Sequence, residues 1–249
     1  MSFDVAAAAY DRFMGRYSRL LAPQLADFAG VGTGQRVLDV GSGPGALTAE
    51  LVRRLGASAV AAVDPSASFI DALRERLAGV EAARSSAEAL PFADGVFDAA
   101  LAQLVVHFMD DPIAGLREMA RVTATGGVVA ACVWDHAGER SPIAVFWRAA
   151  RELDSGVRDE SLLAGAREGA LAELLRAAGL QGVVATELEV PFAHASFEEW
   201  WEPFTLGVGP AGQYLTGLDA DARALLRERC RALLPDAARA VAWAARGVA

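Results

Sequence analysis

The chain has 249 residues, a length that fits one α/β domain with an insertion. Hydrophobic residues make up 53% and charged residues 22%, which is the composition of a globular protein and excludes a disordered chain. The formal net charge of −9 disfavours broad nucleic-acid binding, because a phosphate backbone would repel such a surface.

The sequence indicates a cytoplasmic protein. Its two cysteines, Cys132 and Cys230, have no partner at metal-binding spacing and are expected to be reduced thiols in the core. The first residues carry Asp4 and no basic segment, so they do not resemble a secretory signal. Apolar runs stay well short of the roughly 18 residues that a membrane span needs, and no membrane partner is expected.

Strands and helices are predicted to alternate through the first half. Residues 4–29 have helical spacing of leucines with a break near Gly15, and residues 30–35 form a glycine-rich turn. Strands are expected at 36–40, 58–64, 80–84, 97–104 and 128–134, helices at 46–55, 66–77 and 112–122, and a turn at 123–127. Strands separated by helices of about ten residues predict βαβ units and a doubly wound, mostly parallel α/β sheet.

The second half is more helical. Helices are expected at 141–155 and 168–178, a strand at 183–190, a helical stretch at 196–235 and a last strand at 237–248. We therefore predict a single domain over 1–249 with a helical insertion at about 196–235. It would comprise an N-terminal helical cap (1–35), a cofactor-binding core (36–136) and the rest of the sheet (137–249).

A glycine-rich loop follows the first buried strand. Gly41, Gly43 and Gly45 allow positive φ angles and close approach of a ligand to the backbone, and the next helix points free N–H groups at it. The pattern also satisfies the dinucleotide fingerprint. Asp64, at the end of the second strand, suits a ribose of either NAD or S-adenosylmethionine.

Asp39 distinguishes the two ligands. It lies two residues before Gly41, where a carboxylate would repel a pyrophosphate and suit the ammonium and sulfonium charges of S-adenosylmethionine. An alternative, compatible role is to hold the glycine turn by accepting N–H bonds.

Four segments resemble the successive motifs of class I S-adenosylmethionine-dependent methyltransferases. The resemblance is strongest to the group that includes the ubiquinone and menaquinone C-methyltransferases (methyltransferase type 11), and it covers about residues 10–136. It implies a Rossmann-like sheet of seven strands with an antiparallel last strand, S-adenosylmethionine as cofactor and S-adenosylhomocysteine as product. The segments are VLDVGSGPG, VDPSASFIDAL, SSAEALPFADGVFDAALAQLVVHFMDD and EMARVTATGGVVAACVW.

The resemblance also implies cofactor contacts. The methionine part of the cofactor would lie on the glycine loop with Gln103 and His107 nearby. The N-terminal segment YDRFMGRYSRLLAP resembles the cap of this group and would fold over the cofactor. Ser86 stands where the family has Asp, so any hydrogen bond to adenine would use an uncharged hydroxyl. The implied contacts are Tyr10, Arg16, Asp39, Gly41, Ser42, Gly43, Gly45, Asp64, Pro65, Phe69, Ser86, Ala87, Glu88, Gln103 and His107.

Methyl transfer needs alignment and exclusion of water more than acid–base groups, and a base is needed only for a protonated acceptor. His107 and His136 follow strands at the cofactor edge and are preferred as catalytic residues over His194. Because the three histidines are scattered along the chain and no Cys/His cluster occurs, no metal is expected.

The acceptor is expected to be a small apolar or aromatic molecule. Gln103-Leu104-Val105-Val106 replaces the Asn/Asp-Pro-Pro-aromatic run of nucleobase methyltransferases, so a nucleic-acid acceptor is disfavoured. The large apolar residues near or beyond the strand ends form either the acceptor pocket or the core of the insertion: Trp134, Phe146, Trp147, Trp200, Trp201 and Phe204. The oligomeric state stays open.

Two other functions are left open. An NAD(P)-dependent oxidoreductase would explain the glycine loop and Asp64 but not Asp39, and the chain contains no lysine for a Tyr-x-x-x-Lys pair. A catalytically inactive, methyltransferase-like binding protein would be consistent with Ser86.

Overall fold

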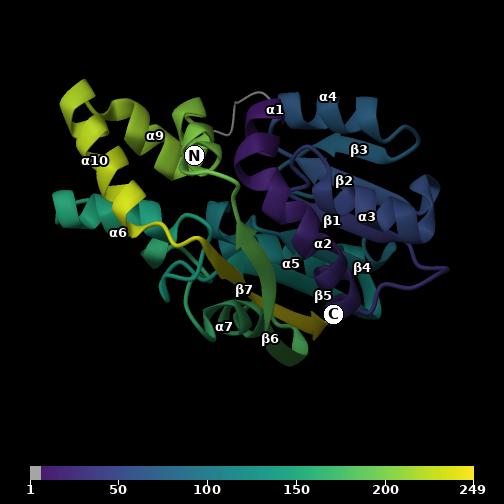
Figure 1. Cartoon of the computed structure of the whole chain (residues 1–249). Coiled ribbons are helices and arrows are strands. Elements are labelled where there is room, and N and C mark those ends of the chain that lie inside the picture. Colours follow the sequence, from purple (N-terminus) through teal and green to yellow (C-terminus); the bar gives the residue numbers. More distant parts are fainter. Residues whose placement is uncertain (1–6) are drawn as a thin grey trace.

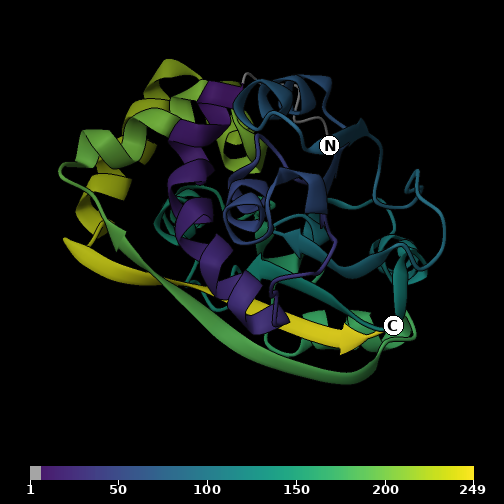
Figure 2. The same cartoon turned by 90° about the vertical axis from the view of Figure 1, so that its right-hand side faces the viewer.

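The computed structural model describes residues 7–249, in which seven strands form one sheet in the order β3-β2-β1-β4-β5-β7-β6 (Figure 1; Figure 2). Strand β7 is antiparallel to both of its neighbours, and the other strand pairs are parallel. The predicted doubly wound arrangement is therefore confirmed, including the antiparallel last strand. The strands are β1 (Val37–Val40), β2 (Val60–Asp64), β3 (Glu81–Arg84), β4 (Phe97–Gln103), β5 (Thr123–Trp134), β6 (Gln181–Ala193) and β7 (Ala237–Val248).

Helices cover both faces of the sheet. Helices α2 and α3 pack in one hydrophobic cluster with Val37 and Leu101, whereas α5 and α7 pack in another with Leu38 and Ala100. This division follows from the alternation of side chains along each strand. The helices are α1 (Ala7–Tyr10), α2 (Arg16–Ala29), α3 (Ala46–Leu55), α4 (Ala67–Arg76), α5 (Pro112–Val122), α6 (Ala144–Leu153), α7 (Ala170–Ala177), α8 (Phe197–Trp201), α9 (Gly209–Gly217) and α10 (Ala220–Leu233).

The N-terminal segment is helical, with an irregular turn at the position of the predicted break near Gly15. Residues 4–6 of the predicted helix lie outside the described residues. From Ala7 the chain stays helical, because a π-helical turn, Asp11–Gly15, joins α1 to α2. A Cβ on Gly15 would lie 2.8 Å from Asp11 Oδ1, so the glycine makes room for this carboxylate.

Strand β5 begins earlier than predicted, and the expected turn at 123–127 is wrong. Thr123 pairs with Phe97, and the register of β4 against β5 then shifts before Ala99 pairs with Val128. Gly126, with φ of 83°, accommodates this irregularity and donates its N–H to Ala249 O. The turn residues are therefore absorbed into an irregular strand that the end of the chain completes.

The predicted helical insertion between β6 and β7 is present as α8, α9 and α10. Its core is aromatic: Phe204 stacks on Phe146 of α6 with centroids 4.7 Å apart and meets Trp200 at 4.8 Å. Figure 1 shows α1 between the insertion and α4. The N-terminal segment thus lies over the sheet edge where the glycine loop is found. Among residues 7–249, no helix is long and apolar enough to cross a membrane.

Candidate active site

The glycine loop connects β1 to α3. Gly41, Gly43 and Gly45 have φ angles of 69°, 53° and 100°. Position 41 also requires glycine for a steric reason, because a Cβ there would lie 2.3 Å from a methyl carbon of Val105. Ser42 stabilises the turn through its carbonyl, which accepts the Gly45 N–H at 3.1 Å. The glycines therefore leave the backbone of the loop without side chains that would keep a ligand from the start of α3.

Asp64 fixes the glycine loop. Its Oδ2 accepts the Gly43 N–H and its Oδ1 accepts the Ser66 N–H, both at 2.8 Å. The side chain is buried, and this burial raises its pKa above the ordinary value. The loop-holding role that the sequence offered as an alternative for Asp39 thus belongs to Asp64, and a ribose would use its remaining lone pairs.

Asp39 lies buried beneath the loop, facing α3. Thr48 Oγ1 donates to Asp39 Oδ2 at 2.6 Å, whereas Oδ1 has no hydrogen-bond partner among residues 7–249. Burial, reinforced by the negative charge of Asp64, raises the pKa of Asp39 from 3.8 to about 7. Thr48 was missed in the sequence, although a polar residue beside Leu47 on a buried helix face was a usable signal.

A second unpaired acceptor lies on the same sheet face. Gln103 Nε2 donates to Ser18 O at 3.0 Å, and its Oε1 has no partner within the described part of the chain. Strands β1 and β4 are neighbours, with Asp39 opposite Leu101. Buried acceptors are normally satisfied, so this pair fits a ligand that brings a cationic donor such as an ammonium group.

The N-terminal cap covers the loop. Tyr10 meets Phe69 of α4 edge-to-face with ring centroids 5.4 Å apart, and its Cε1 lies 3.9 Å from where a Cβ on Gly43 would be. Burial raises the pKa of the Tyr10 hydroxyl to about 12. The aromatic pair therefore closes the region that the resemblance assigns to the adenosine.

The remaining residues assigned to the adenosine have local partners. Ser86 is exposed and Ala87 is buried, side by side in the loop after β3. Glu88 Oε1 accepts the Asp111 N–H at 3.3 Å, and Pro65 O accepts from Arg84 Nε at 2.9 Å. Glu88 thus ties its loop to the start of α5.

Arg16 contacts the helical insertion and the neighbouring Tyr17. Its Nη1 is 3.6 Å from Glu199 Oε1 of α8, and its guanidinium lies 4.8 Å from the centroid of the Tyr17 ring. Glu199 of the insertion is thus the counter-ion of Arg16 in this structure, and the contact of Arg16 with a cofactor carboxylate stays a prediction.

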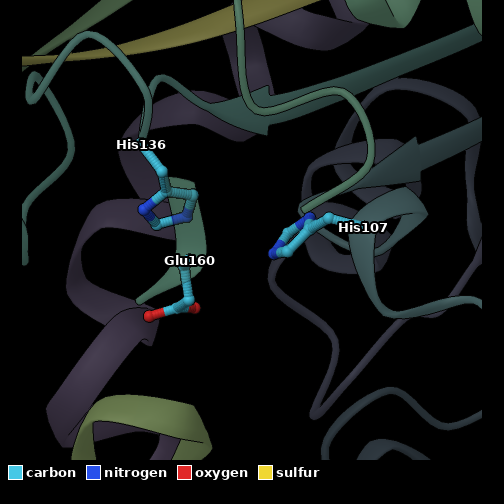
Figure 3. A group of neighbouring side chains, drawn as sticks. All are labelled: His107, His136 and Glu160. Atoms are coloured by element: carbon cyan, nitrogen blue, oxygen red, sulfur yellow. The ribbon is translucent and has the colours of Figure 1, made fainter. Parts of the chain in front are cut away.

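Two histidines meet beyond the ends of adjacent strands (Figure 3). His107 lies on a short helical turn, Val106–Phe108, after β4, and His136 follows β5. Their ring centroids are 5.9 Å apart. The two histidines are far apart in the sequence, but parallel β4 and β5 deliver both to one sheet edge, where their positions after strands predicted them. His194 follows β6 and lies against Phe192.

Glu160 completes a cluster that the sequence did not reveal. It lies on the turn Glu160–Leu162, is 3% exposed, and its Oε2 accepts from Trp147 Nε1 at 2.7 Å. One ligand atom of each residue, His107, His136 and Glu160, lies within 4.8 Å of the others. Glu160 stands in a polar stretch without periodicity, so no local signal marked it.

Burial sets the charge of this cluster. It lowers the pKa of His107 well below 6.5 and that of His136 to about 4, and it raises the pKa of Glu160 to about 7. Both imidazoles are therefore neutral at pH 7.

The cluster lines a cavity of about 30 Å³. Two of the six large apolar residues singled out in the sequence are involved here. Trp134 borders the cavity, and its Nε1 donates to Met14 S at 3.2 Å. Trp147 donates a hydrogen bond to Glu160. The cavity has room for about two water molecules or a small ion. Its lining residues are Tyr10, Phe13, Met14, Leu104, His107, Phe108, Trp134, His136, Ile143, Glu160, Val208, Gly209, Pro210 and Ala211.

Comparison with known proteins agrees with this geometry. Residues 38–131 match a family model described as a methyltransferase domain. An uncharacterized methyltransferase of Mycobacterium bovis is 36% identical over 140 residues, which are 56% of this chain and 54% of that protein. A demethylmenaquinone methyltransferase of Mycolicibacterium paratuberculosis is 35% identical over 167 residues, covering 62% of this chain and 71% of that protein. The crystal structure of the YcgJ protein from Bacillus subtilis has a TM-score of 0.60 at 18% identity, covering 94% and 98% of the two chains.

The chain therefore belongs to the class I methyltransferase family, in the group that includes the demethylmenaquinone and ubiquinone/menaquinone C-methyltransferases. The region aligned with the uncharacterized methyltransferase of Mycobacterium bovis spans about half the length of that protein. Membership of this family favours methyl transfer over the NAD(P)-dependent oxidoreductase that the glycine loop alone left open.

Proposed function

We propose that this protein is a cytoplasmic enzyme that transfers a methyl group from S-adenosylmethionine to a small apolar or aromatic acceptor. The observation that carries the proposal is a pair of buried acceptor atoms, Asp39 Oδ1 and Gln103 Oε1, which have no hydrogen-bond partner among residues 7–249. A dinucleotide would bring negative phosphates to this place, whereas S-adenosylmethionine brings an ammonium group.

The other contacts follow from the positions of the side chains. The amino-acid end would lie on Gly41 to Gly45, between Asp39 and Gln103. Asp64 would accept from the ribose hydroxyls, and Phe69 and Ala87 would border the adenine. The strands β1 to β4 end beside these residues, at the sheet edge where ligands bind in open α/β sheets, and Phe69 lies on α4 after β2.

The bound cofactor supplies a sulfonium-activated methyl group, so the chain has to align the acceptor and keep water out. The closed form leaves only about 30 Å³ beside His107 and His136. Admission of an acceptor therefore requires that the cap, with Tyr10 and Met14, separate from the start of α9. Closure of such a lid over both substrates would exclude water.

The acceptor would be an apolar ring with a polar group. Most of the cavity lining is aromatic or aliphatic, and the polar exceptions gather at His107, His136 and Glu160. The demethylmenaquinone named in one relative belongs to this chemical class. We propose that His107 and His136 contact the polar group of the acceptor. The net charge of −9 argues against a nucleic-acid acceptor, and a membrane partner is not part of the proposal.

Calorimetry on the full chain at pH 8, where Asp39 is ionised, tests the cofactor. S-adenosylmethionine should bind with one site per chain, NAD should not bind, and Asp39→Asn should weaken binding of S-adenosylmethionine at least tenfold. Asp94→Asn is a matched control and should affect affinity less than twofold, because Asp94 pairs with Arg121 near the start of β4, at the opposite end of that strand from Gln103. Binding of NAD alone would reject the proposal.

A further inference from the structure

We propose that His107, His136 and Glu160 bind one divalent transition-metal ion, of the Zn²⁺ or Fe²⁺ type, at the inner end of the acceptor cavity. The site would hold an oxygen atom of the acceptor next to the glycine loop. This second statement rests on the proposed function, whereas the metal site itself does not.

The geometry of the three side chains supports an ion between them (Figure 3). Their ligand atoms lie within 4.8 Å of one another, so a central point is at most about 2.8 Å from each atom. Metal–nitrogen and metal–oxygen distances of about 2.0–2.2 Å are reached from there by small side-chain rotations. The cavity of about 30 Å³ gives the ion and one or two further ligands enough room.

The hydrogen bonding of the cluster points to a missing ligand. Both nitrogens of His136 and Nδ1 of His107 are buried without a hydrogen-bond partner in the part of the chain that the structure describes. The two histidines are each 6% exposed and Glu160 is 3% exposed. Three such groups around one small cavity are costly to bury, and a coordinated cation would satisfy them together.

The kind of ligand selects the kind of metal. Two imidazoles and one carboxylate suit Zn²⁺, Fe²⁺ and related ions, whereas Mg²⁺ and Ca²⁺ prefer oxygen ligands throughout. Three protein ligands leave a coordination position open toward the cavity, as in catalytic metal sites. An acceptor that carries a hydroxyl or carbonyl oxygen could occupy that position.

The surrounding hydrogen bonds also fit a metal site. Trp147 Nε1 donates to Glu160 Oε2 at 2.7 Å, which orients the carboxylate and leaves its other oxygen for an ion. The neighbouring Asp135 is already engaged, because Gly138 N–H donates to its Oδ1 at 2.9 Å and Arg140 Nε to its Oδ2 at 2.6 Å. The cluster is therefore a defined set of three ligands, separate from the adjacent carboxylate.

The test uses the full chain, freed of metal with a chelator and titrated with Zn²⁺ and Co²⁺ without S-adenosylmethionine. We expect one ion per chain by elemental analysis and a visible Co²⁺ spectrum of a four- or five-coordinate site. His136→Asn and Glu160→Gln should weaken Zn²⁺ binding more than 100-fold, and Trp147→Phe by the ~10–100-fold typical of lost outer-sphere partners. His194→Asn, outside the cluster, is the control and should bind Zn²⁺ like the wild type.

Two results would overturn the proposal: no ion bound by the wild-type chain, or Zn²⁺ affinities of the cluster variants equal to that of His194→Asn. Circular dichroism establishes that each variant is folded, and Trp147→Phe provides a variant that leaves all three ligands in place. Because the titration omits the cofactor, its failure is distinct from a failure of S-adenosylmethionine to bind at Asp39.

Discussion

The buried carboxyl group of Asp39 gives a prediction for the pH dependence of stability. Its pKa is raised from 3.8 to about 7 in the folded chain, chiefly by burial. A raised pKa means that folding favours the protonated form. Its contribution to stability is therefore complete below about pH 4 and is lost as the pH rises through 7. Replacement by Asn removes this titration and keeps an oxygen that accepts from Thr48.

The magnitude follows from the two pKa values. Between pH 5 and pH 8, a shift from 3.8 to about 7 lowers the free energy of unfolding of the wild type by about 2–3 kcal/mol relative to Asp39→Asn. The Asn side chain adds a constant offset, because its amide group is an unpaired donor at every pH. The change of this difference with pH is therefore the diagnostic quantity, because groups that titrate alike in both proteins cancel from it.

Urea unfolding of both proteins at pH 5, 6, 7 and 8, without cofactor, measures this difference. The wild type should lose stability relative to Asp39→Asn steadily up to about pH 7 and then more slowly. Parallel profiles would show that the pKa of Asp39 is the same in the folded and unfolded chains, and the argument that burial raises this pKa would then be refuted.

Three further substitutions test the geometry of the site. Gly41→Ala should lower the free energy of unfolding, measured by urea titration, by about 2–4 kcal/mol, because the backbone has a positive φ and the new Cβ would collide with Val105. Adding Val105→Ala to this variant should restore part of the lost stability. Arg16→Ala should change the calorimetric affinity for S-adenosylmethionine less than twofold, because its partner is Glu199; a tenfold loss would mean that Arg16 moves to the cofactor. Gln103→Leu should weaken that affinity at least tenfold, and unchanged binding would remove its Oε1 from the site.

The sequence predicted the elements that depend on local patterns. The helix at 46–55 and the last strand at 237–248 have the predicted bounds, because amphipathic periodicity and glycine punctuation are local properties. The turn expected at 123–127 failed for a long-range reason: pairing of Gly126 with the end of the chain makes a strand of residues whose composition favours a turn.

The candidate site was predictable where the chain is continuous through it. A strand, a glycine loop and a helix follow one another from Val37 to Leu55, so the sequence alone located the loop and placed Asp39 beside it. The motifs also predicted the family, which the comparison with known proteins confirmed. The sequence did not show that Asp64, rather than Asp39, holds the loop, because this depends on the adjacency of β1 and β2.

Tertiary structure alone decided which side chains share the acceptor cavity. The sequence placed His107 and His136 after strands at the cofactor edge, but nothing in the segment of Glu160 marks it as their neighbour. Adjacent parallel strands deliver the two histidines, and the buried bond from Trp147 brings the carboxylate to them. Local sequence encodes the period of each element, whereas the meeting of loops at a sheet edge depends on strand order and packing over the whole chain.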